Sequence, residues 1–161
     1  MNDIDWDDAY ANGAYIDGAD GFPPRWASKA LAFRKALEAK GKCQLNVPYG
    51  AHEREKFDLF LPDAAPRGLV VFVHGGYWQA FDKSSFSHLA AGAIAREYAV
   101  AIPSYVLSPE VPISVITQQI ATAINAAAGM VAGPIHLTGH SAGGHLVTRM
   151  LCSDVTWAGC F

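Results

Sequence analysis

The sequence predicts an α/β fold in which a mostly parallel sheet carries helices on both faces. Short apolar runs alternate with segments of helical spacing, in the order strand, helix, strand, helix, strand, helix. The run at residues 68–73 has no polar alternation, which is typical of a parallel strand buried on both faces. In such a fold we expect the chemistry at the carboxyl ends of the parallel strands.

Residues 1–41 differ from the rest and are predicted to form an irregular arm and one amphipathic helix that pack on the main domain. The arm mixes aspartates with aromatic residues and has turn signals at 17–18 and 21–24. From Trp26 to Lys40 the apolar residues recur at helical spacing, and Gly41 is predicted to end the helix.

Residues 42–161 are predicted to be the N-terminal part of an α/β domain that is incomplete. Alternation around Leu45 and Val47 and over residues 56–61 predicts two half-buried strands at a sheet edge. The elements predicted next are a strand at 68–73, a helix at about 85–98 capped by Asp82 or Ser84, a strand at 99–102, a helix at about 113–128, a strand at 135–138 and a helix from 142 onward.

Composition excludes several classes of protein. Of the 161 residues, 51% are hydrophobic and 17% are charged, so a buried core is available. The formal charge of −3 argues against a binder of nucleic acids or anionic membranes. The N-terminus lacks the features of a secretory signal, and no apolar run approaches the roughly 18 residues of a membrane span. We expect a cytoplasmic protein with no membrane partner.

The cysteines and histidines do not indicate a metal or a disulfide framework. The three cysteines are an odd number without CxxC spacing; they are Cys43, Cys152 and Cys160. A zinc site formed by His136, His140 and His145 is disfavoured, because no Cys, Asp or Glu ligand lies at metal spacing. No G-x-G-x-x-G follows a strand. We therefore expect no cofactor.

A nucleophile motif lies between the last predicted strand and the last helix. Gly139-His140-Ser141-Ala142-Gly143 matches G-x-S-x-G, which places a serine on a sharp strand-to-helix turn. Small residues two positions before and after the serine let neighbouring backbone pass closely. The alternative is an ordinary glycine-rich turn with a helix-capping serine.

A second glycine motif ends the apolar strand. His74-Gly75-Gly76-Tyr77-Trp78 follows residues 69–73, where a loop can aim backbone N–H groups at the oxygen of a tetrahedral intermediate. The alternative for this motif alone is a tight turn with a core histidine. Both motifs fall where a parallel sheet places its loops, and this favours a joint role in acyl transfer.

With these residues the sequence resembles the α/β-hydrolase superfamily, within its hormone-sensitive-lipase-like esterases and, more closely, the kynurenine formamidase (arylformamidase) branch. The resemblance runs from about Lys56 to Leu151. Tyr77-Trp78 gives the HGGxW form typical of formamidases, and residues 104–110 are similar to the esterase segment D-Y-R-L-A-P-E, with Ser104 in place of the aspartate.

The resemblance implies roles for individual residues. Ser141 would be the nucleophile, and the N–H groups of Gly76, Tyr77 and Ala142 would form the oxyanion hole. The residues that would support these two motifs are His74, Gly75, Trp78, Gly139 and Gly143.

A base and an orienting acid are not evident after Ser141. In this superfamily the chain order is serine, acid, histidine, and only Asp154 and His145 follow. We expect His145 to be a core histidine facing the sheet and His140 to point away from the serine. The chain is therefore expected to be a fragment or truncation, with the triad acid and histidine beyond Phe161 and little activity of its own.

Three functions remain open. The first is hydrolysis of the C–N amide bond of an N-formyl arylamine, N-formyl-kynurenine by resemblance, in tryptophan catabolism, with the aromatic part stacked on Trp78, Tyr77 or the N-terminal aromatics. The second is a carboxylesterase for short acyl esters. The third is a non-catalytic binding protein of the hydrolase fold. The predicted partner is a small aromatic amide or ester, and a homodimer is left open.

Overall fold

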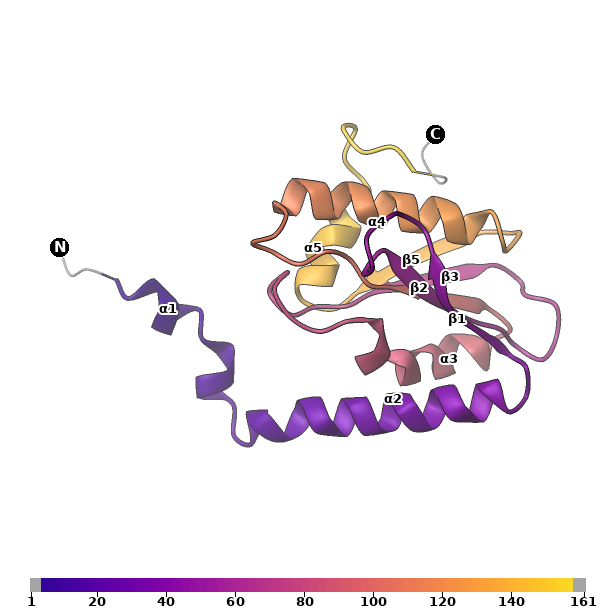
Figure 1. Cartoon of the computed structure of the whole chain (residues 1–161), viewed down its shortest axis with the longest axis horizontal. Coiled ribbons are helices and arrows are strands. Elements are labelled where there is room, and N and C mark those ends of the chain that lie inside the picture. Colours follow the sequence, from indigo (N-terminus) through magenta and orange to yellow (C-terminus); the bar gives the residue numbers. More distant parts are fainter. Residues whose placement is uncertain (1–3, 158–161) are drawn as a thin grey trace.

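The structure, a computed structural model, describes residues 4–157 and contains a five-stranded mixed sheet in the order β1-β2-β4-β3-β5 (Figure 1). The strands are β1 (Cys43–Pro48), β2 (Lys56–Phe60), β3 (Leu69–Val73), β4 (Ala99–Pro103) and β5 (Ile135–Gly139). Strand β3 is parallel to β4 and β5, whereas β1 pairs with β2 and β2 with β4 in antiparallel fashion. The motif-bearing strands β3 and β5 are thus neighbours.

Helices cover both faces of this sheet, which confirms the predicted fold class. The α-helices are α1 (Trp6–Ala9), α2 (Phe22–Glu38), α3 (Ala91–Ile94), α4 (Ile113–Ala128) and α5 (Ala142–Arg149). Helices α4 and α5 lie on one face, and α2 and α3 lie on the other (Figure 1). Helix α2 begins before Trp26 because Pro23 and Pro24 occupy its first turn, where a missing N–H is tolerated.

Each face has its own hydrophobic core. On one side α4 presents Ile116, Ile120 and Ile124 at four-residue spacing, and they pack with Leu69 and Val71 of β3. Each such side chain stabilises the fold by about 1.5–3 kcal/mol when fully buried. The opposite face is covered by Phe33 and Leu37 of α2, which contact Phe60 and Ile102.

Strand β2 is interior, so the prediction of a half-buried edge strand is wrong for it. All of Phe57–Phe60 is buried, including the carboxylate of Asp58. Lys83 Nζ lies 2.8 Å from Asp58 Oδ1 and donates a hydrogen bond to Asn46 Oδ1 at 2.7 Å. The ion pair satisfies a charge that would otherwise be costly to bury.

The helix predicted at about 85–98 is wrong as one element. The chain forms two 3₁₀ turns, Lys83–Ser85 and Ser87–Ala90, before the single turn of α3. Asp82 caps the first turn, its Oδ1 accepting a hydrogen bond from Ser84 N at 2.7 Å. The serines favour such local bonds over helix interiors, and Arg34 of α2 binds the Ser84 carbonyl and Ser87 Oγ.

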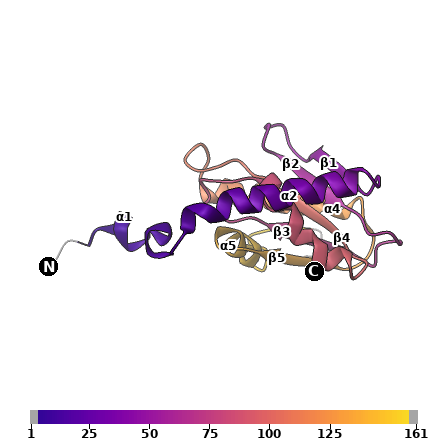
Figure 2. The same ribbon diagram turned by 90° about the horizontal axis from the view of Figure 1, so that it is seen from below.

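The segment before α2 lies to one side of the sheet, beyond the N-terminal end of α2 (Figures 1 and 2). It consists of α1 and two 3₁₀ turns, Asn12–Tyr15 and Ala19–Gly21. Asp5 caps α1 by accepting hydrogen bonds from Asp7 N and Asp8 N at 3.1 Å. We call residues 4–21 the arm. Over residues 4–157, no helix combines the length and apolarity required to cross a bilayer.

Candidate active site

Ser141 lies on a strained turn between β5 and α5. Its backbone has φ 53° and ψ −120°, a combination that non-glycine residues adopt only where surrounding structure enforces it, at about 1–3 kcal/mol. The side chain is exposed and caps no backbone group of the helix. This excludes the capping alternative for Ser141 and leaves its hydroxyl available at the helix N-terminus.

The flanking glycines allow the backbone to close around this turn. A Cβ atom on Gly143 would run into the carbonyl oxygen of Val73, and one on Gly139 would run into the carbonyl of Gly143. His140 N donates to Val73 O at 3.1 Å and ties the turn to the end of β3. Both positions therefore need glycine for steric reasons.

The loop after β3 has an uncommon backbone. Gly76, Tyr77 and Trp78 have φ values of 109°, 52° and 59°, and Gly76 O accepts hydrogen bonds from the N–H groups of Gln79 and Ala80. Only glycine fits at position 76, because a Cβ atom there would clash with Ala80 O. The positive φ values and the lack of space at residue 76 therefore fix the path of this loop.

Three amide groups at this edge of the sheet have no acceptor. Within residues 4–157, no hydrogen bond is made by the N–H of Gly76, Tyr77 or Ala142. Ala142 N is also at the positive end of the α5 dipole. Open, pre-positioned N–H groups are what a developing oxyanion requires.

His74 is buried under this loop. Its ring stacks between Phe86 and Tyr105, with centroids 5.8 and 4.4 Å away, and Nδ1 donates to Gly75 O at 2.8 Å. The Tyr105 hydroxyl donates to the His74 carbonyl at 3.0 Å. Burial lowers the pKa of His74 from 6.5 to about 4, so the ring is neutral at physiological pH. It holds the loop rather than taking a proton from Ser141.

A pocket of about 630 Å³ opens in front of Ser141. It is bounded by the arm, the start of α2, the loop after β3 and the turn at Ser141. The lining residues are Asn12, Gly13, Ile16, Ala19, Phe22, Pro23, Trp26, Gly75, Gly76, Tyr77, Phe81, Phe86, His140 and Ser141.

The aromatic residues of the pocket differ in part from those expected. Tyr77, Phe22 and Trp26 line it, but Trp78 does not; its ring packs edge-on against His145 at 5.3 Å. Phe81 and Phe86 were missed, because their only sequence signal is two phenylalanines in a segment predicted to be loop and helix. The pocket-lining role of residues 12–19 likewise has no local signal.

The histidines and Asp154 do not supply a base–acid pair in the described chain. Within residues 4–157, no histidine ring hydrogen-bonds to Ser141. Asp154 pairs with Arg149 at 2.6 Å. The same residues contain no cluster of three or more potential metal ligands. Cys43 and Cys152 are free, and Cys160 lies outside the described residues.

One expectation about the histidines is wrong. His145 is exposed rather than in the core. The face of α5 that meets the sheet is formed by Ala142, Gly143 and Leu146. Because successive residues of a helix are rotated by about 100°, His145 lies to the side of this face. His140 lines the same pocket as Ser141.

Comparisons with known proteins agree on fold and family. The family described as BD-FAE matches residues 57–154. A kynurenine formamidase of Salmo salar is 31% identical over 134 residues, which are 79% of this chain and 46% of that protein. This chain therefore spans about half the length of that relative.

Two solved structures extend the comparison. A crystal structure from Silicibacter sp. TM1040, named "putative thioesterase", is 60% identical with a TM-score of 0.92, over 98% of this chain and 59% of that one. Esterase B of Lactobacillus rhamnosis has a TM-score of 0.63 at 18% identity, over 89% of this chain and 55% of that one, and shares the fold.

Proposed function

Because the chain belongs to the BD-FAE family and has the α/β-hydrolase fold, we propose that it carries the nucleophile and the oxyanion hole of a serine hydrolase. The observation that carries this proposal is that Ser141 and the residues with open amides, Gly76 and Tyr77, border one pocket. The third open amide is that of Ala142, the residue that follows the serine at the start of α5. Such donors each contribute about 10²–10³ in kcat in enzymes of this type.

The proposed reaction is cleavage of the C–N bond of an N-formyl arylamine. Ser141 Oγ attacks the formyl carbon, and its proton passes to a base and then to the leaving nitrogen as the C–N bond breaks. Water then attacks the formyl-serine and releases formate and the free hydroxyl. The base and its orienting acid come from outside residues 4–157. The formamidase relative and the aromatic lining of the pocket support this substrate class.

A second candidate is hydrolysis of short acyl esters or thioesters by the same groups. It is favoured by the name of the 60% identical chain from Silicibacter. The tetrahedral intermediate is the same, and only the leaving atom differs. In a preparation that turns over either compound, kcat/KM for formanilide should exceed that for phenyl acetate. Equal or better ester turnover would favour the esterase.

The nucleophile itself is tested by chemical rescue in this chain. A fluorophosphonate probe should label Ser141 slowly in buffer and faster when imidazole supplies the missing base. Ser141→Ala should abolish labelling, whereas Ser114→Ala, at an exposed position on α4, should not change it. No imidazole-dependent labelling, or equal labelling of the Ser141→Ala variant, would favour a non-catalytic binding protein.

A further inference from the structure

The pocket in front of Ser141 is lined without a single Asp, Glu, Lys or Arg among its residues in the described chain. Its polar groups are Asn12, the Tyr77 hydroxyl, His140, Ser141 and backbone. A carboxylate placed against the aromatic side of this space, away from the open amides beside Ser141, would find no cationic side chain in the lining to pair with. Moving an unpaired ion from water to such surroundings is unfavourable.

One side of the pocket is an aromatic wall formed by Phe22, Trp26, Phe81 and Phe86. The centroid of Trp26 lies 6.0 Å from that of Phe81 and 5.7 Å from that of Phe86, and Phe81 and Phe86 meet edge-on at 5.8 Å. Phe22 adds to the end of this wall at 5.9 Å from Trp26. Rings in contact at these distances give a continuous apolar surface for an aromatic or alkyl group.

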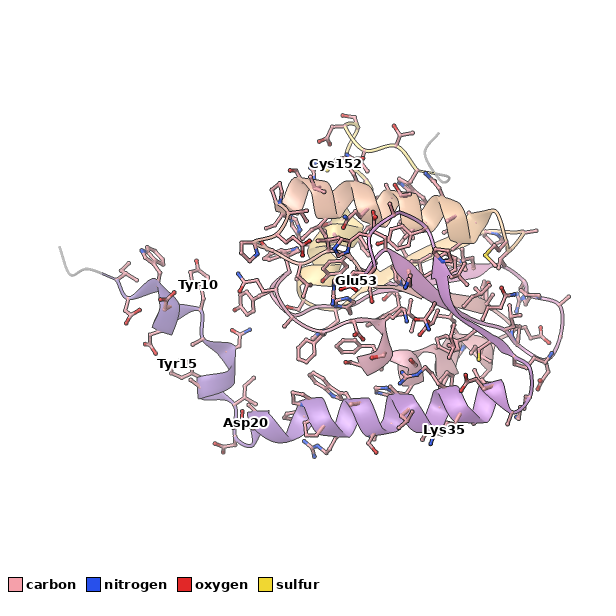
Figure 3. The ribbon with its side chains drawn as sticks, in the orientation of Figure 1. Tyr10, Tyr15, Asp20, Lys35, Glu53 and Cys152 are labelled. Atoms are coloured by element: carbon pink, nitrogen blue, oxygen red, sulfur yellow. The ribbon has the colours of Figure 1, made fainter. Side chains whose placement is uncertain are left out.

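The opposite rim belongs to the arm, which is acidic. Residues 4–21 hold no Lys or Arg and five aspartates, which are Asp5, Asp7, Asp8, Asp17 and Asp20. Arg25, which follows the arm and does not line the pocket, lies 4.5 Å from the centroid of the Phe22 ring. Asn12, Gly13, Ile16 and Ala19, which line the pocket, lie between them. Figure 3 shows Tyr10, Tyr15 and Asp20 on this segment. The negative potential of the arm repels anions over about 8–10 Å at moderate salt.

A hydrogen bond links the arm to the loop after β3. The Tyr77 hydroxyl donates to the carbonyl of Tyr10 at 2.6 Å, and the Tyr15 hydroxyl donates to Asp8 Oδ1 at 2.7 Å. The residue that offers a backbone N–H to the pocket therefore also holds the acidic rim beside it.

From these observations we propose that the pocket selects neutral aromatic or alkyl groups and rejects groups that carry a carboxylate. The inference rests on the proposed function in taking this pocket as the binding site for the part of the substrate next to the scissile bond. Within N-formyl arylamines, it assigns the preference to uncharged N-aryl formamides.

Binding to the 161-residue chain tests this selectivity without any catalytic step. Formanilide and 4-formamidobenzoate have the same formamide and ring and differ by one carboxylate. In an NMR shift titration at pH 8 and low salt, we expect formanilide to bind at least about tenfold more tightly. Equal affinities would overturn the proposal.

A charge placed in the lining should reverse the preference. Asn12→Lys puts a cation in the pocket, and we expect it to tighten 4-formamidobenzoate by about tenfold with little effect on formanilide. Ala14→Lys adds the same charge at an exposed residue of the same turn that is not in the lining, and should leave most of the difference intact. If Ala14→Lys is as effective as Asn12→Lys, the net charge of the arm and not the lining sets the selectivity.

The outcome is separable from that of the nucleophile. Ser141 labelling reports the chemistry, and these titrations report the pocket, so either can fail alone. Trp26→Leu provides a second readout: it should weaken formanilide while preserving the ratio between the two probes, because it shortens the aromatic wall without adding charge. A changed ratio would count against the proposal.

Discussion

Gly75 leaves no room for a side chain beside Ser141: a Cβ atom on Gly75 would stand 3.0 Å from the Cβ of Ser141 and 2.7 Å from His140 O. The loop that offers amides to the pocket and the turn that carries the serine therefore touch without a side chain between them. Their separation is set by β3 and β5, which are neighbours in the sheet. Any added atom at residue 75 must push one of them away.

Gly75→Ala should consequently reduce reactivity more than stability. We expect imidazole-supported labelling of Ser141 to fall by about 10²-fold or more, as for loss of an oxyanion donor. Gly92→Ala is the matched control, because nothing lies within 4 Å of a Cβ atom there, and it should label like the parent. Labelling of the Gly75→Ala variant at the parental rate would contradict this account of the contact.

His74 should make folding stability depend on pH. Its pKa is about 4 in the folded protein and 6.5 when unfolded, so between these values the unfolded chain binds more protons. Stability is then full above about pH 6.5 and falls as the pH drops toward 4, by up to about 3 kcal/mol. Urea unfolding at several pH values measures this, and His74→Phe, which keeps a ring in the stack, should show a shallower loss. An equally steep loss in that variant would assign the effect to other groups.

Breaking the buried Lys83–Asp58 ion pair should lower the free energy of unfolding more than breaking an ion pair on the surface. Lys83→Met leaves the Asp58 carboxylate buried without its cation, and we expect a loss of about 3–5 kcal/mol in the free energy of unfolding. Lys83→Met combined with Asp58→Asn should recover much of it, because the asparagine oxygen still accepts from Asn46 N and no charge remains. Urea titrations of the single and double variants give the coupling energy. Additive losses would show that the two groups do not interact.

Tyr77→Phe should loosen the arm. The variant removes the 2.6 Å bond to the Tyr10 carbonyl, worth about 0.5–1.5 kcal/mol. Hydrogen exchange of the amides at residues 11–16 should speed up, and formanilide should bind several-fold more weakly. Tyr98→Phe is the control, because the Tyr98 hydroxyl makes no hydrogen bond in the described part of the chain. Unchanged exchange in Tyr77→Phe would mean that packing alone holds the arm.

Local sequence patterns predicted most of the elements that position the site. Helix α4 has the predicted bounds, and β3 and β5 lie within one residue of theirs, because uninterrupted apolar runs and isoleucine at four-residue spacing are local signals. The prediction of one helix at about 85–98 was wrong because helical spacing alone does not register Asp82, which caps the first short turn and accepts hydrogen bonds from Ser84 N and Oγ.

The pocket was only partly predictable. Gly75 and Ser141 are motif residues, and their roles follow from the turn that each must make. Asn12 and Ile16 lie more than fifty residues before the loop that they face, and no periodicity encodes such a contact. His145 was misplaced for a related reason: the face that a short helix presents to the sheet depends on the turn that starts it.

The division of the pocket between two segments has a consequence for how substrate range changes. The part of the pocket lining that residues 12–19 contribute belongs to neither the sheet nor the helices that cover the sheet. Its side chains can be exchanged without loss of core packing and without moving the serine. Libraries of substitutions confined to residues 12–19 would therefore change which ligands bind in the pocket and leave the turn that carries Ser141 unchanged. The situation resembles the grafting of one binding loop onto a constant framework.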